Sequence, residues 1–394
     1  MKKDWTYKKL GEVLVVERGG SPRPIQAYLT TDPNGLNWIK IGDAVEGSKY
    51  ITSTKEKIKP EGLHKTRFVN KGDFILSNSM SFGRPYILDI DGCIHDGWLV
   101  LRDKENVFDK SFLYYYLSSP NVYNEFKRLA VGGVVNNLNS ELVRGVTLPI
   151  PPISIQESIV RELDAIHGIL EKKQEQLREL DNLAQAIFYD MFGDPITNPK
   201  QWEVKKLIEL VHKDCPVSYG IVQPGDGEEK GVPVVRPVDL KDSDYIGREN
   251  LKLTTQKISD SYSRTILRGD EILICVRGTT GLLGLVSSAL KGCNVTRGIV
   301  PLFFADDIAT KLFIFAALKT PAIQSIIADK TYGATLKQIN IKDLRDIEFP
   351  LPPLPLQQSF AAKIEAIEAQ KQAVQQSIRE VEALLAERMD HYFS

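Results

Sequence analysis

The sequence of 394 residues contains few cysteines and no long apolar run. Its four cysteines, Cys93, Cys215, Cys275 and Cys293, form no Cys-x-x-Cys pair, and so sparse a set of thiols is typical of a reducing compartment. The apolar run near residues 312–318 is far shorter than the ~20 residues of a membrane helix, and the first residues lack the apolar centre of a signal peptide. We therefore expect a cytoplasmic protein.

Metal-binding and catalytic motifs are also missing. Cys93 and His95 are close together, but no second pair lies at zinc-site spacing, so we expect a buried thiol, a structural histidine and no metal. The sequence has no phosphate-binding P-loop, no Gly-x-Ser-x-Gly elbow and no Asn/Asp-Pro-Pro-aromatic tetrapeptide of an amino-methyltransferase. Residues 237–241 lack the paired acids that a metal-dependent nuclease needs. We expect a chain that is not catalytic by itself.

A large charge of one sign is absent as well, because the formal net charge is −1. Residues 1–152 carry 21 basic and 17 acidic side chains, and residues 194–353 carry 21 and 20. The stretches 153–193 and 354–394 are acidic, with 4 basic against 8 acidic and 4 against 6 side chains. This balance argues against a polyanion-binding surface over the whole chain, but it permits a local basic patch for nucleic acid.

The sequence does contain a long internal repeat. Three short motifs occur twice in the same order, at residues 5–10 and 202–207, 71–76 and 268–273, and 149–153 and 350–354, with offsets of 197, 197 and 201. Gln156 also returns as Gln357. The period is far longer than the ~20–50 residues of a solenoid repeat, so it is a whole domain with its connector that is duplicated. A duplicated binder is suited to a two-part target.

Each half of the sequence predicts a globular stretch followed by a long helix. Short β-prone runs bounded by turn residues alternate with one amphipathic helix, expected at residues 111–129 in the first half and 309–328 in the second. The class is α+β. We predict globular domains over residues 1–152 and 194–353 and long helices over residues 153–193 and 354–394.

A proline-rich hinge should precede each long helix, because proline fixes φ and disfavours helix in the residue before it. Ser154 is a plausible N-cap, with Glu157 three residues later, and Gly193 ends the first helix. Apolar residues at 3/4 spacing form one narrow seam on each helix: Leu163, Ile166, Leu170, Leu177, Leu180, Ile187, Ile364, Ile367, Val374, Ile378, Val381 and Leu385.

A narrow seam on an otherwise charged helix favours a partner helix over packing on the helix's own domain. We therefore predict that the two long helices pair as an antiparallel coiled coil with pseudo-two-fold symmetry, and that they act as a spacer between the globular domains. Lys173 and Lys371 interrupt the seam. Buried polar residues in such a seam can set its register, but we expect these lysines to extend their ammonium groups into solvent.

These features together resemble the specificity (S) subunits of type I restriction–modification systems. The resemblance covers the whole chain and rests on a Trp-x-x-x-x-Leu entry, a Pro-x-Pro-Pro exit with a following glutamine, and a trailing long helix, each present twice. It implies that the globular stretches are target-recognition domains, each reading half of a bipartite sequence in double-stranded DNA. It also implies that the helices are the conserved regions, which dock two methyltransferase (M) subunits.

Restriction (R) subunits would join that complex, so the resemblance implies partners but no cofactor on this chain. S-adenosylmethionine, ATP and magnesium are expected on the partner subunits. Two readers on a rigid spacer predict half-sites about one helical turn of DNA, ~10 bp, apart. Because the loops of the two halves differ, we predict an asymmetric target.

Base contacts come from loops that carry Arg, Lys, Asn and Gln, and three pairs of loops qualify. The candidate DNA-binding residues are Asn78, Arg84, Arg277 and Thr279 in the first pair, Lys40 and Arg236 in the second, and Asn136, Asn137, Lys337 and Gln338 in the third. For each, a local role is the alternative: a solvated turn, an ion pair of Lys40 or Arg236 with the aspartate three residues on, or a drifting surface loop.

Two other functions fit the same sequence. One is the recognition subunit of a type IIB-like system, in which a single partner chain both cleaves and methylates. The other is a protein–protein scaffold that does not bind nucleic acid, which the near-zero net charge permits.

Overall fold

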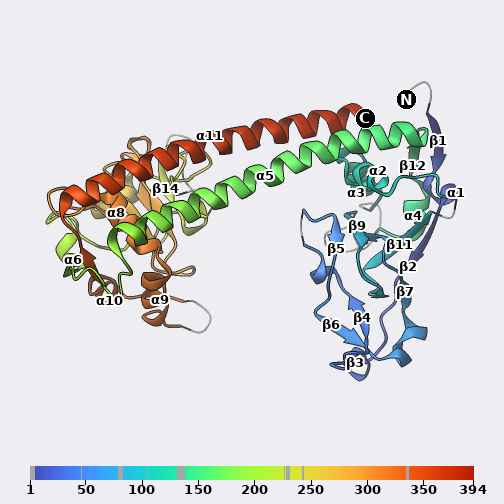
Figure 1. Ribbon diagram of the computed structural model, residues 1–394, viewed down its shortest axis with the longest axis horizontal. Coiled ribbons are helices and arrows are strands. Elements are labelled where there is room, and N and C mark those ends of the chain that lie inside the picture. Colours follow the sequence, from blue (N-terminus) through green and yellow to red (C-terminus); the bar gives the residue numbers. More distant parts are fainter. Residues whose placement is uncertain are drawn as a thin grey trace. The chain divides into compact units, whose positions relative to one another are not determined.

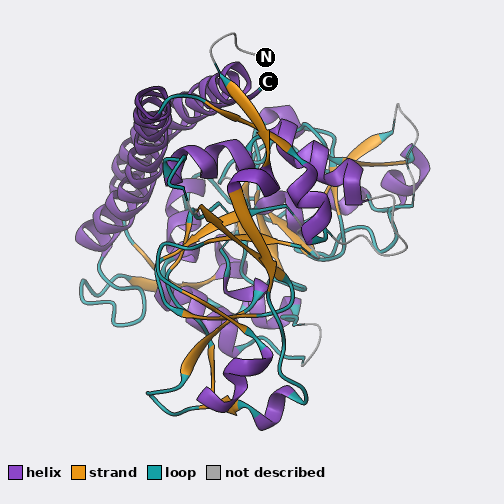
Figure 2. Ribbon diagram, turned by 90° about the vertical axis from the view of Figure 1, so that its right-hand side faces the viewer, coloured by secondary structure: helices purple, strands orange, loops and turns teal. Residues whose placement is uncertain are grey.

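The computed structural model describes residues 5–45, 47–78, 83–103, 105–130, 138–225, 227, 231–241, 244–333 and 337–394. The chain divides into two compact units. Unit 1 comprises Met1–Gln174 and Ser377–Ser394, and unit 2 comprises Glu175–Gln376. Figure 1 follows the chain by colour, and Figure 2 shows that helices and strands are mixed along it, as the predicted α+β class requires.

Unit 1 contains three sheets. In the smallest, β1 (Thr6–Lys9) pairs antiparallel with β12 (Thr147–Ile150). A five-stranded sheet has the order β3 (Leu29–Thr30), β6 (Glu56–Ile58), β4 (Leu36–Ile39), β10 (Gly92–Ile94) and β7 (Arg67–Val69). The other has the order β2 (Leu14–Arg18), β11 (Trp98–Asp103), β8 (Phe74–Ser77), β9 (Pro85–Leu88) and β5 (Tyr50–Ile51).

Unit 2 repeats this plan with shorter sheets. Its pair is β13 (Glu203–Lys206) with β20 (Glu348–Leu351). Its three-stranded sheets have the orders β15 (Lys252–Thr254), β14 (Val232–Val235) and β18 (Asn294–Val295), and β17 (Leu283–Leu285), β16 (Ile272–Cys275) and β19 (Ile299–Leu302). The parallel pair of β14 with β18 matches that of β4 with β10, and unit 1 has a second parallel pair, β5 with β9.

The structure corrects one alignment drawn from the sequence. Strand β8 starts at Phe74 and β16 at Ile272, an offset of 198 rather than the 197 of the motif letters. Asp73 therefore matches Glu271, since Leu88 N–H donates to the Asp73 carbonyl just as Val286 N–H donates to that of Glu271, at 2.9 Å in both. The repeated letters Gly-Asp therefore occupy different places in the two turns. Asn70 N–H donates to the Asp73 carboxylate just as Arg268 N–H donates to that of Glu271, three residues on in each.

The single amphipathic helix expected in each half is wrong, because each is broken by a proline. Unit 1 has α2 (Lys110–Ser118) and α3 (Pro120–Ala130), and unit 2 has α8 (Lys311–Lys319) and α9 (Pro321–Asp329), which bend by 69°. Proline has no N–H to continue the helical ladder. The residue before it caps the next helix instead: Ile323 N–H donates to Thr320 Oγ1 at 3.3 Å.

Short helices complete the two units. They are α1 (Leu10–Val13) and α4 (Ser140–Gly145) in unit 1, and α6 (Leu207–Leu210), α7 (Gln256–Ser261) and α10 (Ile341–Arg345) in unit 2. Within the described residues no helix is both long and apolar enough to cross a membrane alone. Only α8 and α9 taken together, as a bent pair, reach the necessary length and hydropathy.

The two long helices, α5 (Ile153–Phe192) and α11 (Leu354–Phe393), each begin in one unit and end in the other. They pack together antiparallel in both units (Figure 1). In unit 1, Glu162 near the start of α5 contacts Arg388 and Tyr392 near the end of α11. In unit 2, Asp181 of α5 contacts Lys371 of α11.

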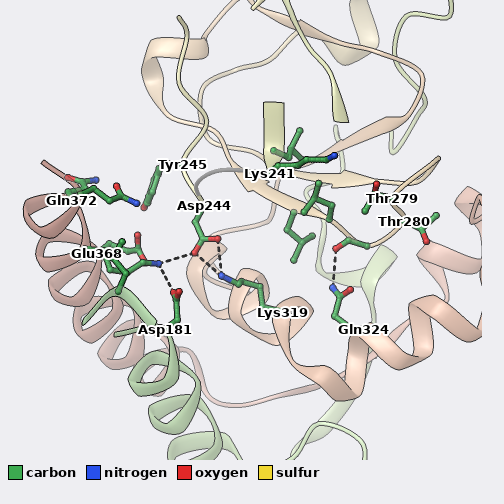
Figure 3. Close-up of a pocket in the computed structure, with 17 residues that line it drawn as sticks. Asp181, Lys241, Asp244, Tyr245, Thr279, Thr280, Lys319, Gln324, Glu368 and Gln372 are labelled. Carbon is green, nitrogen blue, oxygen red and sulfur yellow. Dashed lines mark hydrogen bonds and ion pairs between the residues drawn. The ribbon is translucent and has the colours of Figure 1, made fainter. Parts of the chain in front are cut away.

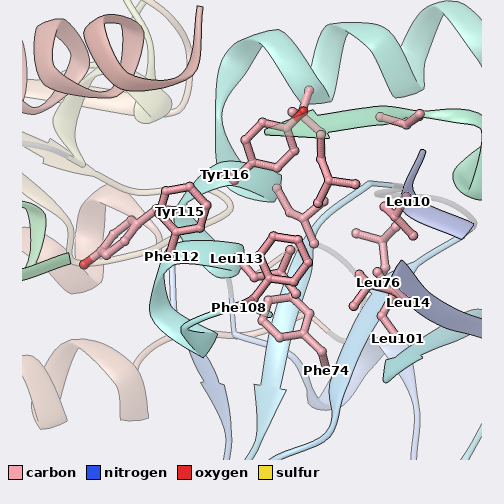
Figure 4. Packing of buried hydrophobic residues seen from close by; sticks show 14 of the residues in the cluster. Leu10, Leu14, Phe74, Leu76, Leu101, Phe108, Phe112, Leu113, Tyr115 and Tyr116 are labelled. Carbon is pink, nitrogen blue, oxygen red and sulfur yellow. The ribbon is translucent and has the colours of Figure 1, made fainter. Parts of the chain in front are cut away.

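Aromatic side chains at the far end of each long helix enter the core of the unit that it reaches. Phe393 of α11 lies edge-on to Phe112 of α2, at 5.6 Å between ring centroids, and joins the apolar cluster of unit 1 shown in part in Figure 4. Phe192 of α5 makes the matching contact with Phe313 of α8, at 4.9 Å. Burying each ring contributes about 2–3 kcal/mol, so both helix ends are firmly attached to their units.

Candidate nucleic-acid interface

The repeated glutamine anchors each long helix to the globular domain before it. Gln156 is fully buried, and its Oε1 accepts from Asp109 N–H at 2.8 Å while its Nε2 donates to the carbonyls of Val107 and Pro151 at 2.9 Å. Buried amides need such partners, and here they tie the proline hinge to the start of α2.

Gln357 does the same in unit 2. Its Oε1 accepts from Thr310 N–H at 2.9 Å, and its Nε2 donates to the carbonyls of Ile308 and Pro352 at 3.2 and 2.8 Å. The sequence showed that this glutamine recurs but not what it does. The sequence does carry a signal for this anchoring role, because a single polar residue recurs after the proline run in both halves.

The first pair of candidate loops follows β8 and β16. Both close with a glycine N–H that donates to the last strand residue: Gly83 to the carbonyl of Ser77 at 2.7 Å, and Gly281 to that of Cys275 at 2.8 Å. Both glycines have positive φ, +77° and +84°, a conformation that other residues avoid. The described ends of the two loops, which span residues 78–83 and 276–281, are thus held alike; residues 79–82 lie outside the described residues.

This register places Arg84 level with Leu282 rather than with Arg277. Arg84 begins the return into β9, and its N–H donates to Ser77 Oγ at 3.0 Å. Asn78 is buried, and its Nδ2 donates to the Asp96 carbonyl at 3.0 Å. Neither residue therefore occupies the place in its loop that Arg277 has in unit 2.

A second segment crosses each loop at its base. Leu138 N–H donates to the Asn78 carbonyl at 2.9 Å, and Ile339 N–H donates to the Val276 carbonyl at 3.0 Å. In unit 2 this brings Arg277 opposite Gln338 and joins Gly278 N–H to the Lys337 carbonyl at 2.8 Å. The candidates of the first and third loop pairs are therefore neighbours there. Asn136 and Asn137 lie outside the described residues.

Thr279 belongs to the same loop and lies at the edge of a cavity of about 570 Å³ in unit 2 (Figure 3). The opposite side of this cavity is formed by α5 and α11, through Asp181, Glu368 and Lys371. The loop that carries Arg277 and Thr279 is thus placed beside the segments of the long helices that belong to unit 2.

The second pair of candidates, Lys40 and Arg236, precedes a short 3-10 turn in each unit. The backbone N–H of Lys40 donates to Asp43 at 2.8 Å and that of Arg236 to Asp239 at 2.7 Å. The Arg236 guanidinium also pairs with Asp239, at 2.8 Å, which is the local ion pair considered from the sequence. Lys40 Nζ pairs instead with Glu56, at 2.6 Å.

Lys371 does not extend into solvent as expected, because it is 8% exposed. Its Nζ lies 2.8 Å from Asp181, 2.8 Å from Glu368 and 3.3 Å from Asp244 (Figure 3). Lys319 of α8 adds a second cation, at 2.8 Å from Asp244. We call these five residues the Lys371 cluster. The prediction failed because the globular part of unit 2 covers the helix at this position.

Two members of the Lys371 cluster, Lys371 and Asp244, are held in their charged forms. Burial lowers the pKa of Lys371, but the hydrogen bond to Asp181 and the charges of Asp244 and Glu368 outweigh it, so the pKa is raised overall. Burial likewise raises the pKa of Asp244, and the two lysines more than reverse that effect. A buried charge paired in this way fixes how the strand edge near Asp244 meets the two helices.

The predicted seam residues are all at least half-buried. Leu163, Ile166, Leu170, Leu180, Ile364, Ile367 and Val374 are buried, and Leu177, Ile187, Ile378, Val381 and Leu385 are half-buried. Lys173 is half-buried, and it lacks the surrounding carboxylates that Lys371 has.

The cysteines are buried and free. Burial raises the pKa of Cys93 to about 11, so this thiol is poorly suited to bind a metal as thiolate. His95 Nδ1 accepts from Gly97 N–H at 3.0 Å, which is a structural contact. In the described part of the chain no three His, Cys, Asp or Glu side chains gather as a metal site would require.

Comparison with known proteins supports the assignment suggested by the repeat. The model of the family described as "Type I restriction modification DNA specificity domain" matches residues 2–180 and 199–383. The type I restriction enzyme EcoBI specificity subunit of Escherichia coli is 21% identical over 369 residues, which cover 88% of this chain and 76% of that protein. The putative type I restriction enzyme MjaX specificity subunit of Methanocaldococcus jannaschii is 25% identical over 400 residues, with coverage of 93% and 87%.

Solved structures show the same fold. A chain from a structure of a type I restriction–modification system is 20% identical with a TM-score of 0.59, covering 100% of this chain and 98% of its own length. The S subunit of a type I system from M. genitalium is 15% identical with a TM-score of 0.51, covering 99% and 98%. Since the family match spans both halves, this chain belongs to the type I restriction–modification DNA specificity family, that of the S subunits.

Proposed function

We propose that this chain reads DNA for a type I restriction–modification enzyme, with each unit recognising one half of an asymmetric bipartite target. The observation that carries the proposal is the loop that follows β8 and recurs after β16. The same backbone hydrogen bonds hold it at Asn78 and at Val276. A duplicated frame with different side chains is what two readers of unlike half-sites need.

The remaining roles follow from the family. The chain itself carries out no chemistry and supplies sequence specificity to partner subunits. Two M subunits would dock on α5 and α11, and R subunits would complete the enzyme. S-adenosylmethionine, ATP and magnesium would be bound by those partners. The near-neutral charge of this chain fits a complex in which its partners supply many of the phosphate contacts.

The test is single-molecule sequencing of methylated bases in cells that carry this chain with its neighbouring methyltransferase. We expect a bipartite, asymmetric motif with a fixed gap, which disappears when this chain is deleted and returns on complementation. A palindromic motif would contradict unlike half-sites. If no methylation depended on this chain while the methyltransferase worked with another reader, the proposal would be wrong.

Binding to duplex DNA in the presence of the methyltransferase separates this function from a scaffold. A reader prefers the bipartite duplex over one with both half-sites scrambled. A scaffold shows no preference between the two.

A further inference from the structure

Three short segments of unit 2 lie side by side next to the loop after β16. Arg277 is the antiparallel partner of Gln338, and Gln338 is the antiparallel partner of Tyr332. We call Arg277, Gln338 and Tyr332 the Arg277 row. The row crosses three segments that pair only through isolated bridges, outside the named strands. These bridges form a small surface separate from the two main sheets of unit 2.

The hydrogen bonds define which way the side chains of the row point. Gly278 N–H donates to the Lys337 carbonyl at 2.8 Å, and Ile339 N–H donates to the Val276 carbonyl at 3.0 Å. These two bonds flank Arg277 and Gln338, which are therefore a non-hydrogen-bonded pair, the arrangement with the closest side chains.

Tyr332 and Gln338 form the other kind of pair. Their backbones exchange both hydrogen bonds, each 2.9 Å long. Residues directly opposite each other in an antiparallel pair project from the same face. The side chains of Arg277, Gln338 and Tyr332 therefore project from one face.

The polar groups of the row have donors to offer. Arg277 Nε is buried and has no hydrogen-bond partner among the described residues. In the same part of the chain, the side-chain amide of Gln338 has no protein partner either. The contrast is Arg236, whose guanidinium is bound to Asp239. Within the described residues no carboxylate pairs with the Arg277 guanidinium, so its charge stays available to an acceptor from outside the chain.

The row is also held in place. Tyr332 is 45% exposed, and its hydroxyl donates to Asn340 Oδ1 at 2.5 Å. Behind the row, Thr331 Oγ1 lies 3.1 Å from Thr280 Oγ1, and Gln324 of α9 donates to the Gly281 carbonyl at 3.1 Å. These contacts fix both the loop and the crossing segment to the end of α9, so the row need not be ordered on binding.

We propose that the Arg277 row is the base-reading edge of unit 2. Arg277 donates two parallel hydrogen bonds to O6 and N7 of a guanine, and Gln338 pairs with N6 and N7 of an adenine in the adjacent base pair. The half-site of unit 2 therefore contains a G·C pair next to an A·T pair. This inference rests on the proposed function and deepens it by naming two of the bases that are read.

The competing role for Arg277 is contact with a DNA phosphate. The neighbouring Lys337 helps to distinguish phosphate contact from base contact. Lys337 is exposed beside the row and carries the point charge that a phosphate needs. A guanidinium fork in a backbone-fixed pair with an amide is suited instead to the planar edge of a base.

The experiment measures binding of this chain, assembled with its methyltransferase, to duplexes in which each base pair of the target is substituted in turn. Arg277→Ala and Arg277→Lys should each lower discrimination at one G·C pair by about 10- to 100-fold and leave the other half-site unchanged. Gln338→Ala should relax the adjacent A·T pair. Lys337→Ala is the matched comparison and should weaken all duplexes alike.

A modified base makes the test sharper. Replacing the read guanine with 7-deazaguanine removes the N7 acceptor. We expect this to weaken binding by the unsubstituted chain and to make no difference to Arg277→Ala. If the modified duplex weakened both proteins equally, or if both Arg277 variants weakened all duplexes alike, the inference would be overturned while the bipartite reader stood.

The two levels of failure are distinguishable. If the unsubstituted chain with its methyltransferase shows no preference for either half-site, the proposed function fails, and the Arg277 row fails with it. Thermal melting of each variant checks folding. Should Arg277→Ala not fold, Arg277→Lys, which keeps the charge but not the fork, and Gln338→Ala decide the outcome.

Discussion

The two units use opposite charges at the same place in the fold. Lys49 and Asp244 are equivalent, because their carbonyls accept from Ile87 and Leu285 N–H, which are matching residues of β9 and β17. Lys49 pairs with Asp164 of α5 at 3.7 Å, whereas Asp244 pairs with Lys371 of α11 at 3.3 Å.

The aromatic surroundings differ as well. In unit 1 the Lys49 ammonium lies 5.2 Å from the centre of the Tyr115 ring, which stacks on His167 at 5.5 Å. Tyr115 also hydrogen-bonds Asp164. The positions 201 residues later are Ala316 and Glu368, so unit 2 has an alanine and a carboxylate where unit 1 has two rings.

The comparison shows which parts of a duplicated fold can change. Gln156 and Gln357 keep the same three hydrogen bonds, so each hinge satisfies its backbone groups in the same way. An ion pair is often replaceable at little net cost, provided both members change together. The reversal also disfavours exchange of the two globular domains, since Lys49 would then meet Lys371.

The largest loss of stability is expected for Lys371→Met, which removes the charge that distinguishes unit 2 at this place. It leaves Asp244, Asp181 and Glu368 without their shared cation, and removing one partner of a buried ion cluster costs about 3–5 kcal/mol. Urea denaturation of the full chain measures the loss. Lys173→Met, at a half-buried seam position of α5, is the control and should cost far less. Equal losses would mean that Lys371 is not a special position.

Substitution of the equivalent glutamines is expected to cost the same stability in both units. Gln156→Leu and Gln357→Leu each leave one N–H and two carbonyls without partners, at a cost of about 2–3 kcal/mol in the free energy of unfolding. Gln372→Leu on the exposed face of α11 is the control. A large difference between the two glutamine variants would show that the hinges are not equivalent.

Acid should affect the Lys371 cluster through Asp244. Its folded pKa is lowered, so its stabilising contribution is full above the ordinary carboxyl pKa of about 3.9 and is lost as the pH falls through the folded value. At pH 7, Asp244→Asn should be less stable than the unsubstituted chain, and the loss should be smaller than that of Lys371→Met. The difference in stability between Asp244→Asn and the unsubstituted chain should close as the pH falls below about 4. Melting temperatures across this range test it; a constant difference would exclude Asp244 as the titrating group.

The smallest expected effect is the change in the pH dependence of stability that His167 causes in unit 1. Burial lowers the pKa of His167, and the charge of Asp164 only partly opposes this. The neutral ring is therefore favoured in the folded state, and its contribution, full above about pH 6.5, is lost as the pH falls through the folded value. His167→Gln should reduce the loss of stability between pH 7 and pH 5.

Local patterns in the sequence predict most of this fold but not its registers. The long helices, their hinges and the α+β class follow from proline positions and apolar spacing, because these act through the local backbone. Pro120 and Pro321 also mark the breaks that divide the predicted amphipathic helices. The 198-residue offset of β8 and β16 is visible only in the backbone hydrogen bonds, because the repeated Gly-Asp letters occupy different places in the two turns.

The sequence indicates the candidate loops but not how their residues are arranged. Arg277, Thr279, Lys337 and Gln338 were chosen from loops, yet only the backbone bridges show that Arg277 and Gln338 are partners and that Tyr332 completes their row. Asn78 was chosen by residue type and proves to be buried. The role of Lys371 could not be predicted, because its carboxylate partners come from three segments that meet only in the folded chain.

Both long helices pass from one unit into the other, at Gln174–Glu175 and at Gln376–Ser377, and they do so in opposite directions. A protease that cuts α5 at Gln174–Glu175 breaks the covalent bond between Met1–Gln174 and the rest of the chain. The two fragments then stay together only through the packing of Ser377–Ser394 within unit 1. Nicked chains should stay together under native conditions and run as two fragments only after denaturation.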